Sequence, residues 1–279
     1  MRLSVVSAYG EVALQDRGRF GFRQQGVPPA GPFDRFAAEC CAALVGDACP
    51  VLEVGGSLEA VCEQPGTLAW AGCGSVTVDG ERRRPGRWQV KAGERIEVHG
   101  AARLYLAALG GWSGDPALGS VCGFVETALR GAESHPFDEV ALAWSGHERP
   151  KEARIVPLVS GWDDAELRVG LRSSRAGIRL EGANLRDLEE RPSVPVVPGC
   201  VQLAPSGELL VIGPDGPVTG GYRLVGWLCP TDLDRVGQWR AGDSVLLKRA
   251  TEAVALQAAA KEREARSTFL AALRVAARA

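Results

Sequence analysis

The sequence lacks several features that would place it at once in a large class of proteins. None of its apolar runs approaches the roughly 18 residues that a membrane-spanning helix needs, and the longest, such as 104–109, have the length of a strand. No long apolar segment stands near the N-terminus, so a secretory signal is not expected. The motifs Gly-x-x-x-x-Gly-Lys-Ser/Thr, Gly-x-Ser-x-Gly and His-Glu-x-x-His are absent. These absences argue against a membrane protein, a P-loop ATP site and two common classes of hydrolase.

Charge and cysteine usage exclude further classes. With 32 basic and 34 acidic residues the net charge is −2, which gives no bulk attraction to nucleic acid or to anionic lipid. The eight cysteines form no Cys-x-x-Cys pair and the three histidines stand apart from them, so we expect neither a metal site nor disulfides. Reduced thiols are typical of a cytoplasmic protein. His99 follows a predicted strand and is expected on the surface.

The composition favours many turns between short strands. The 35 glycines and 17 prolines are too many for a helical bundle and too few for a disordered chain. Short β-branched or apolar runs bounded by Gly, Asp or Pro predict strands, and Asp79-Gly80 predicts a tight turn. The clearest of these runs are 76–78, 96–98, 209–212 and 244–247.

Three segments predict helices instead. Residues 34–45 open with Asp34 as an N-cap, carry apolar residues at helical spacing, and end before Gly46. Residues 232–238 predict a second, short helix. From Thr251 to Ala279 glycine disappears and strong helix formers dominate, which predicts a terminal helix. The sequence leaves open whether this helix breaks near Ser267, and whether it packs on the body of the protein or binds a partner.

Short patterns recur in the same order in both halves of the chain. Arg19-x-Gly-x-Arg recurs at Arg175, and the Ala-Gly-acid turn at 92–94 recurs at 241–243. Two further pairs lie at 27–28 and 197–198, and at 66–70 and 207–211. Four patterns in collinear order predict a duplicated β unit. We therefore expect two β lobes, at 1–150 and 151–250, followed by the helix at 251–279.

Two glycine-rich segments are the candidates for chemistry. Residues 15–34 combine glycines, which let backbone N–H groups approach a ligand, with arginines that suit a carboxylate. An arginine–aspartate network that braces a long loop is an equal alternative. Residues 215–222 follow an apolar strand and place a hydroxyl, two glycines and a phenol together, with a glycine-rich bulge or hairpin as the alternative.

The order of these blocks resembles the biotin-dependent carboxyltransferase-like family, which includes the C subunit of 5-oxoprolinase, the second subunit of allophanate hydrolase and the KipA proteins. The matching blocks span about residues 3–247 and are numerous enough to make the resemblance specific. They include Gln15-Asp16-x-Gly-Arg, Gly26-Val-Pro, Leu44-Val-Gly, Leu52-Glu53, Tyr105-Leu-Ala, residues 174–182, and Thr219-Gly-Gly-Tyr222.

The resemblance implies a mainly β fold with two cyclophilin-like β-barrel lobes, in agreement with the duplication. It also implies part of an enzyme that acts with a KipI-like protein, the counterpart of the 5-oxoprolinase B subunit, and with a LamB/YcsF-like protein, the counterpart of the A subunit. In 5-oxoprolinase the assembly hydrolyses the lactam of 5-oxoproline to glutamate at the expense of ATP. The chain itself would bind no cofactor, ATP would lie elsewhere in the complex, and the sequence leaves open whether biotin takes part.

The resemblance also suggests roles for individual residues. The candidate catalytic residues are Asp215, Thr219 and Tyr222. The candidate substrate-binding residues are Arg19, Asp34, Arg175, Arg179, Gln202, Gly220 and Gly221.

Several polar positions of the family pattern are replaced in this chain. Where Asp, Met and Tyr are common in the Arg-x-Gly block, the chain has Ser174, Ala176 and Ile178, and Pro217 and Val218 replace another polar pair. The loss of hydrogen-bonding groups supports an alternative function. In that alternative the chain is a non-catalytic, KipA-like protein that binds and regulates a KipI-like partner.

Overall fold

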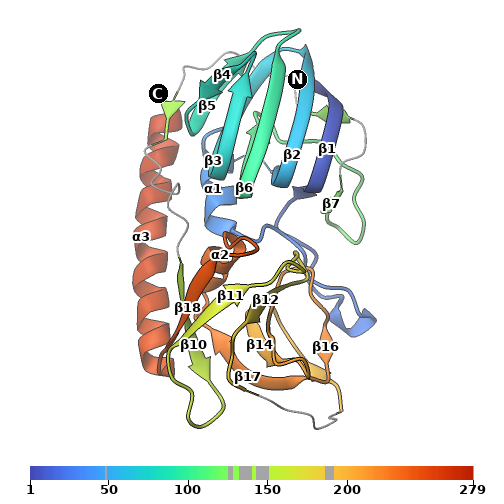
Figure 1. The fold of residues 1–279 in the computed structure, drawn as a ribbon. Coiled ribbons are helices and arrows are strands. Elements are labelled where there is room, and N and C mark those ends of the chain that lie inside the picture. The colour runs from blue at the N-terminus through green and yellow to red at the C-terminus, as the bar shows by residue number, and fades with distance from the viewer. Residues whose placement is uncertain (48, 125–127, 132–139, 143–150, 186–191, 279) are drawn as a thin grey trace. The chain divides into compact units, whose positions relative to one another are not determined.

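The computed structural model describes residues 1–278 except 48, 125–127, 132–139, 143–150 and 186–191 (Figure 1). The chain divides into two compact units, each assembled from separate stretches of sequence. The first unit comprises Met1–Gly18, Asp34–Glu148 and Arg266–Ala279, and the second comprises Arg19–Phe33 and Arg149–Ala265. These units differ from the predicted domains because residues 19–33 belong to the second unit and the end of the terminal helix to the first.

The first unit is built on a nine-stranded sheet. Its central path runs β7-β1-β2-β6-β3-β5-β9, with β4 paired to β3 and β8 paired to β1, and all ladders are antiparallel. Asp79 and Gly80 both have positive φ in the turn between β3 and β4, as that dipeptide predicts. The strands are β1 Arg2–Gln15, β2 Val51–Gln64, β3 Gly66–Val78, β4 Glu81–Arg83, β5 Gly86–Val90, β6 Arg95–Ala108, β7 Gly123–Phe124, β8 Ala128–Arg130 and β9 Val140–Ala141.

Helix α1 (Arg35–Ala43) covers part of this sheet and confirms the predicted helix. The Asp34 carboxylate accepts a hydrogen bond from the Ala37 N–H at 3.0 Å, which is the predicted N-cap. The helix buries Cys40, Cys41 and Leu44 against small strand residues such as Ala69, whose size lets a helix approach closely. Most of the remaining apolar side chains of the strands form a separate core around Trp70.

The second unit is a closed seven-stranded barrel. The strands follow one another in the order β10-β17-β14-β15-β12-β11-β18, and a parallel ladder between β10 and β18 closes the ring. A short pair, β13 and β16, lies outside the ring. The bounds are β10 Glu152–Pro157, β11 Ala165–Val169, β12 Gly177–Glu181, β13 Val194–Pro195, β14 Cys200–Leu203, β15 Leu209–Ile212, β16 Thr219–Gly220, β17 Arg223–Leu228 and β18 Ser244–Arg249.

The other two predicted helices are also present. Helix α2 spans Asp232–Gly237, and α3 is one continuous helix over Glu252–Arg278, so it does not break at Ser267. In the second unit α3 buries Ala255 and Ala259, and in the first it buries Leu270 and Leu273. The terminal helix therefore packs on the body of the protein. Among the described residues no helix is long and apolar enough to cross a membrane.

One part of the predicted duplication is visible in the hydrogen bonds. In the first unit the Gly93 N–H donates to the Cys62 carbonyl at 2.7 Å, and the Cys62 N–H donates to the Glu94 carbonyl at 2.9 Å. The equivalent turn before β18 repeats both bonds. They join Gly242 N–H to the Val169 carbonyl at 2.8 Å, and Val169 N–H to the Asp243 carbonyl at 2.9 Å.

Two other expectations need correction. Of the two predicted barrels only the second unit forms one, because in the described part of the first unit no ladder joins the terminal strands β7 and β9. The two Arg-x-Gly-x-Arg segments are not equivalent either. Residues 19–23 form a loop that enters the 3-10 turn η1 (Arg23–Gln25), whereas residues 177–179 begin strand β12.

Candidate functional site

The glycine-rich segment Arg19–Phe33 is anchored on the barrel of the second unit. The Ala30 N–H donates to the Pro214 carbonyl at 3.0 Å, and the Arg23 guanidinium donates to the Val196 and Val218 carbonyls. The Phe33 side chain is buried in the barrel core. These contacts hold the loop beside the segment that carries the other candidate residues.

Arg175 and Asp215 form the polar centre of this region. The Arg175 guanidinium contacts the Asp215 carboxylate through two bonds, from Nε at 2.7 Å and from Nη2 at 3.0 Å. Nη2 also donates to the Gly31 carbonyl at 2.7 Å, and the Arg175 side chain is only 4% exposed. An arginine–aspartate pair thus braces the glycine-rich loop, although both partners lie outside the segment 15–34 for which the sequence offered such a network.

The Thr219–Tyr222 segment directly follows Val218, whose carbonyl accepts a hydrogen bond from Arg23 of the loop. Thr219 and Gly220 form β16, which pairs with β13. A Cβ at Gly220 would lie 2.8 Å from Nε2 of Gln202, so the glycine permits close approach of the Gln202 amide. That amide donates to the Tyr222 carbonyl at 3.2 Å, which fixes the backbone that carries the phenol.

Two hydroxyls in this segment remain available for a ligand. Within the described residues neither the Thr219 nor the Tyr222 hydroxyl has a hydrogen-bond partner, and the Tyr222 side chain is 45% exposed. Gly221, between them in sequence, is partly exposed. The segment can therefore offer two hydroxyls to a ligand, which suits hydrogen bonding to an amide or a carboxylate.

The other predicted residues have contacts of their own. The Arg179 guanidinium pairs with the Glu208 carboxylate at 3.3 Å. Asp34 belongs to the first unit, where it caps α1 and its N–H donates to the Tyr105 hydroxyl at 2.8 Å. Arg19 closes its own loop through a 2.7 Å bond from its N–H to the Pro29 carbonyl. Their substrate-binding roles stay predictions.

A buried polar network in the first unit escaped the sequence reasoning. The Tyr105 hydroxyl donates to Glu53 at 2.8 Å, and Arg103 contacts the same carboxylate at 3.2 Å. All three side chains are buried. Burial, followed by the negative charges of Glu53 and Asp34, raises the pKa of Tyr105 well above its ordinary value, so the phenol stays neutral and donates. The sequence signal for this network is a glutamate and a tyrosine within otherwise apolar strand segments.

The described residues show no side-chain cluster of the kind that holds a metal ion. Across the described ranges there is no group of three or more His, Cys, Asp or Glu side chains that could hold one. The prediction that the chain binds no metal stays a prediction.

The chain is similar to two curated bacterial proteins. It is 27% identical to the 5-oxoprolinase C subunit of Escherichia coli (strain K12), in an alignment that covers 87% of this chain and 89% of that protein. It is 26% identical to the 5-oxoprolinase C subunit of Haemophilus influenzae (strain ATCC 51907 / DSM 11121 / KW20 / Rd), with 96% of both chains covered.

Solved structures share the fold. The crystal structure of TTHA0988 superposes with a TM-score of 0.79 at 25% identity over 90% of this chain, which spans about half (56%) of that longer chain. The Kluyveromyces lactis urea amidolyase matches with a TM-score of 0.78 at 19% identity, covering 98% of this chain and 20% of that enzyme. The family model of the carboxyltransferase domain, subdomain A and B, matches residues 25–160 and 162–249. The chain therefore belongs to the carboxyltransferase domain family, subdomain A and B.

Proposed function

We propose that the chain is one component of an ATP-dependent, 5-oxoprolinase-like amidohydrolase, or of a related carboxyltransferase complex, that acts on a small amide or lactam carboxylate. The observation that carries this proposal is the relation to the 5-oxoprolinase C subunits over nearly the whole of both chains. The name of those proteins indicates a complex, so we propose two partners. One is a KipI-like protein in the place of the B subunit, and the other is a LamB/YcsF-like protein in the place of the A subunit. A cytoplasmic location belongs to the same proposal.

The chemistry is divided between this chain and its partners in this proposal. Hydrolysis of a lactam adds the hydroxyl of water to the carbonyl carbon and a proton to the nitrogen as the C–N bond breaks. This chain would bind the substrate, and ATP would bind to another protein of the complex because the sequence has no P-loop. Whether biotin takes part is left open.

Within the chain, the free hydroxyls of Thr219 and Tyr222 orient the amide of the substrate. The backbone N–H groups of Gly220 and Gly221 are proposed to face the negative charge that develops on the carbonyl oxygen. Because the charge of Arg175 is already matched by Asp215, we propose that Arg175 holds the Asp215 carboxylate in place and does not itself bind the substrate. Arg19, Arg179 and Asp34 remain proposed substrate contacts.

The test is reconstitution of the complex. Co-expression with LamB/YcsF-like and KipI-like proteins from the same genome should give ATP hydrolysis that depends on 5-oxoproline and that releases glutamate. Replacing Tyr222→Phe should lower this rate by roughly 10- to 100-fold, since one oriented hydrogen bond to the reacting amide is lost. Leu171→Ala, on a side chain that is 87% exposed, is the matched control and should leave the rate unchanged.

A specific observation favours a second candidate function. At the position where the family pattern has Tyr, Ile178 is 1% exposed in the barrel core, so packing replaces a polar group. In this alternative the chain only binds and regulates a KipI-like partner. Recovery of a stable complex whose ATPase stays at background, with or without 5-oxoproline, would favour regulation and contradict the enzyme proposal.

A further inference from the structure

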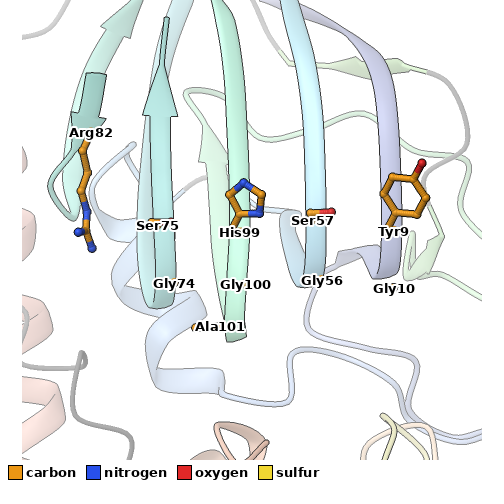
Figure 2. A pocket seen from close by; sticks show the side chains of 10 residues that line it. All are labelled: Tyr9, Gly10, Gly56, Ser57, Gly74, Ser75, Arg82, His99, Gly100 and Ala101. Carbon is orange, nitrogen blue, oxygen red and sulfur yellow. The ribbon is translucent and has the colours of Figure 1, made fainter. Parts of the chain in front are cut away.

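Four polar side chains form a row across neighbouring strands of the first unit. The register places Tyr9 of β1 opposite Ser57 of β2, Ser57 opposite His99 of β6, and His99 opposite Ser75 of β3. Directly opposed residues in an antiparallel sheet have Cβ atoms about 5 Å apart, so their side chains stand next to one another. Figure 2 shows these side chains with Arg82 of β4 beyond Ser75.

The next position on each strand is a glycine, and the backbone there leaves no room for a side chain. Gly10 pairs with Gly56, and Gly74 pairs with Gly100. A Cβ would lie 2.0 Å from the Tyr9 carbonyl oxygen at Gly56, 2.2 Å from the His99 oxygen at Gly74, and 2.1 Å from the Val54 oxygen at Gly100. The glycines leave a depression in the surface of the sheet, because a row of residues without side chains lies beside the row of polar side chains.

The result is a hollow of about 560 Å³ on the sheet, open to solvent. That volume lies within the range of about 300–1,000 Å³ that is usual for sites of small ligands. None of the residues that line the hollow is acidic, and its polar side chains are Tyr9, Ser57, Ser75, Arg82 and His99.

The polar side chains of the hollow make no polar contact with other described residues. Within the part of the chain that the structure describes, none of these five side chains forms a hydrogen bond or an ion pair. The neighbouring row differs. There Glu97 accepts from the Thr77 hydroxyl at 2.9 Å and lies 3.7 Å from Arg95, which also pairs with Glu59. The carboxylates of Glu97 and Glu59 therefore already have partners, whereas no described carboxylate pairs with the guanidinium of Arg82.

We propose that this hollow is a binding site for a small oxyanion, either a carboxylate or a phosphoryl group. The Arg82 guanidinium supplies a planar pair of donors, the His99 ring supplies an N–H, and the Ser57, Ser75 and Tyr9 hydroxyls complete a set of donors on one surface. The site lies wholly in the first unit and shares no residue with the proposed substrate site, so it stands or falls independently of the proposed function.

The test uses inorganic phosphate and acetate as probes. The chain has only three histidines, so the imidazole NMR signals of ¹³C-histidine-labelled protein are few, and His99→Gln assigns the one of interest. Each anion is titrated at constant ionic strength, with chloride as the compensating ion. We expect a saturable shift of the His99 signals, and the anion that binds more tightly identifies the ligand as a phosphoryl or a carboxylate group.

Two arginine variants show whether the response comes from the hollow. Arg82→Gln should weaken the apparent affinity roughly fivefold, as expected for loss of one exposed charge-assisted contact. Arg84→Gln removes the same charge from an exposed neighbour outside the hollow and should change nothing. Circular dichroism checks that both variants are folded. The proposal is overturned if neither anion gives a saturable shift, or if both variants weaken binding equally.

Discussion

Breaking the ion pair between Arg175 and Asp215 is expected to destabilise the second unit by about 2 kcal/mol. The pair joins two segments of the barrel 40 residues apart, and Arg175 also holds the Gly31 carbonyl of the anchored loop. We consider Asp215→Asn, which keeps the size of the side chain and one acceptor oxygen but removes its charge.

The magnitude follows from how deeply each partner is buried. Removing one member of a fully buried pair costs about 3–5 kcal/mol, because the other charge is left unmatched. An exposed pair contributes about 0–1 kcal/mol. The Arg175 side chain is 4% exposed and the Asp215 side chain is 35% exposed, so water compensates only the aspartate side of the pair. A value between the two limits is therefore expected.

A double-mutant cycle measures this interaction. Arg175→Met, Asp215→Asn and the double variant are unfolded with urea, and the coupling is the part of the double effect that the single effects do not explain. The control is the pair of Arg274 and Asp47, which has similar contact distances, with Nε at 2.8 and 2.9 Å from the two carboxylate oxygens, but side-chain exposures of 41% and 48%. A coupling at Arg175–Asp215 no larger than that of the control would refute the reasoning.

Three further perturbations test other parts of the fold, each by urea unfolding. Leu273→Ala should cost about 2–3 kcal/mol because it opens a cavity under α3, whereas Val275→Ala, 71% exposed on the same helix, should stay within about 0.5 kcal/mol. Gly56→Ala should cost about 3 kcal/mol through backbone overlap, whereas Gly123→Ala, whose nearest atom among the described residues would lie 3.9 Å away, should be nearly neutral. Burial on its own raises the pKa of Asp16, but hydrogen bonds from the Ser120 hydroxyl and from backbone N–H groups lower it overall below its ordinary 3.8. Asp16 therefore stabilises the fold above pH 3.8 and loses this contribution as the pH falls through the lower folded value, so Asp16→Asn should cost more near neutral pH than below pH 3.8.

Local signals in the sequence predicted the elements whose structure depends on local chemistry. Asp34 is an N-cap because its carboxylate reaches an N–H three residues on, and Asp79-Gly80 turns because both residues tolerate positive φ. The terminal helix followed from composition alone. In each case the deciding interaction lies within a few residues, so the sequence window contains it.

The division of the chain depended on distant contacts, and the sequence window does not contain those. Phe33 stands next to the N-cap of α1, yet its ring is buried in the core of the second unit with residues such as Ile155 and Val236. No pattern within residues 19–33 indicates that partner, so the repeats that predicted a lobe over 1–150 could not show that this segment groups with the second unit. The same limit applies to barrel closure, which depends on a ladder between β10 and β18.

In both candidate sites the sequence shows which residue types are present, but it does not show which residues each of them contacts. The sequence predicted Arg175 for substrate binding and Asp215 for catalysis, and only their 2.7 Å contact shows that each already has the other as its partner. The sequence predicts only that His99 follows a strand and lies on the surface. Antiparallel pairing places Ser57 and Ser75 on either side of it, 42 residues before and 24 residues before along the chain. Whether a surface histidine in a strand belongs to a binding site therefore depends on the residues opposite it in the sheet. The anion titration at His99 tests this directly.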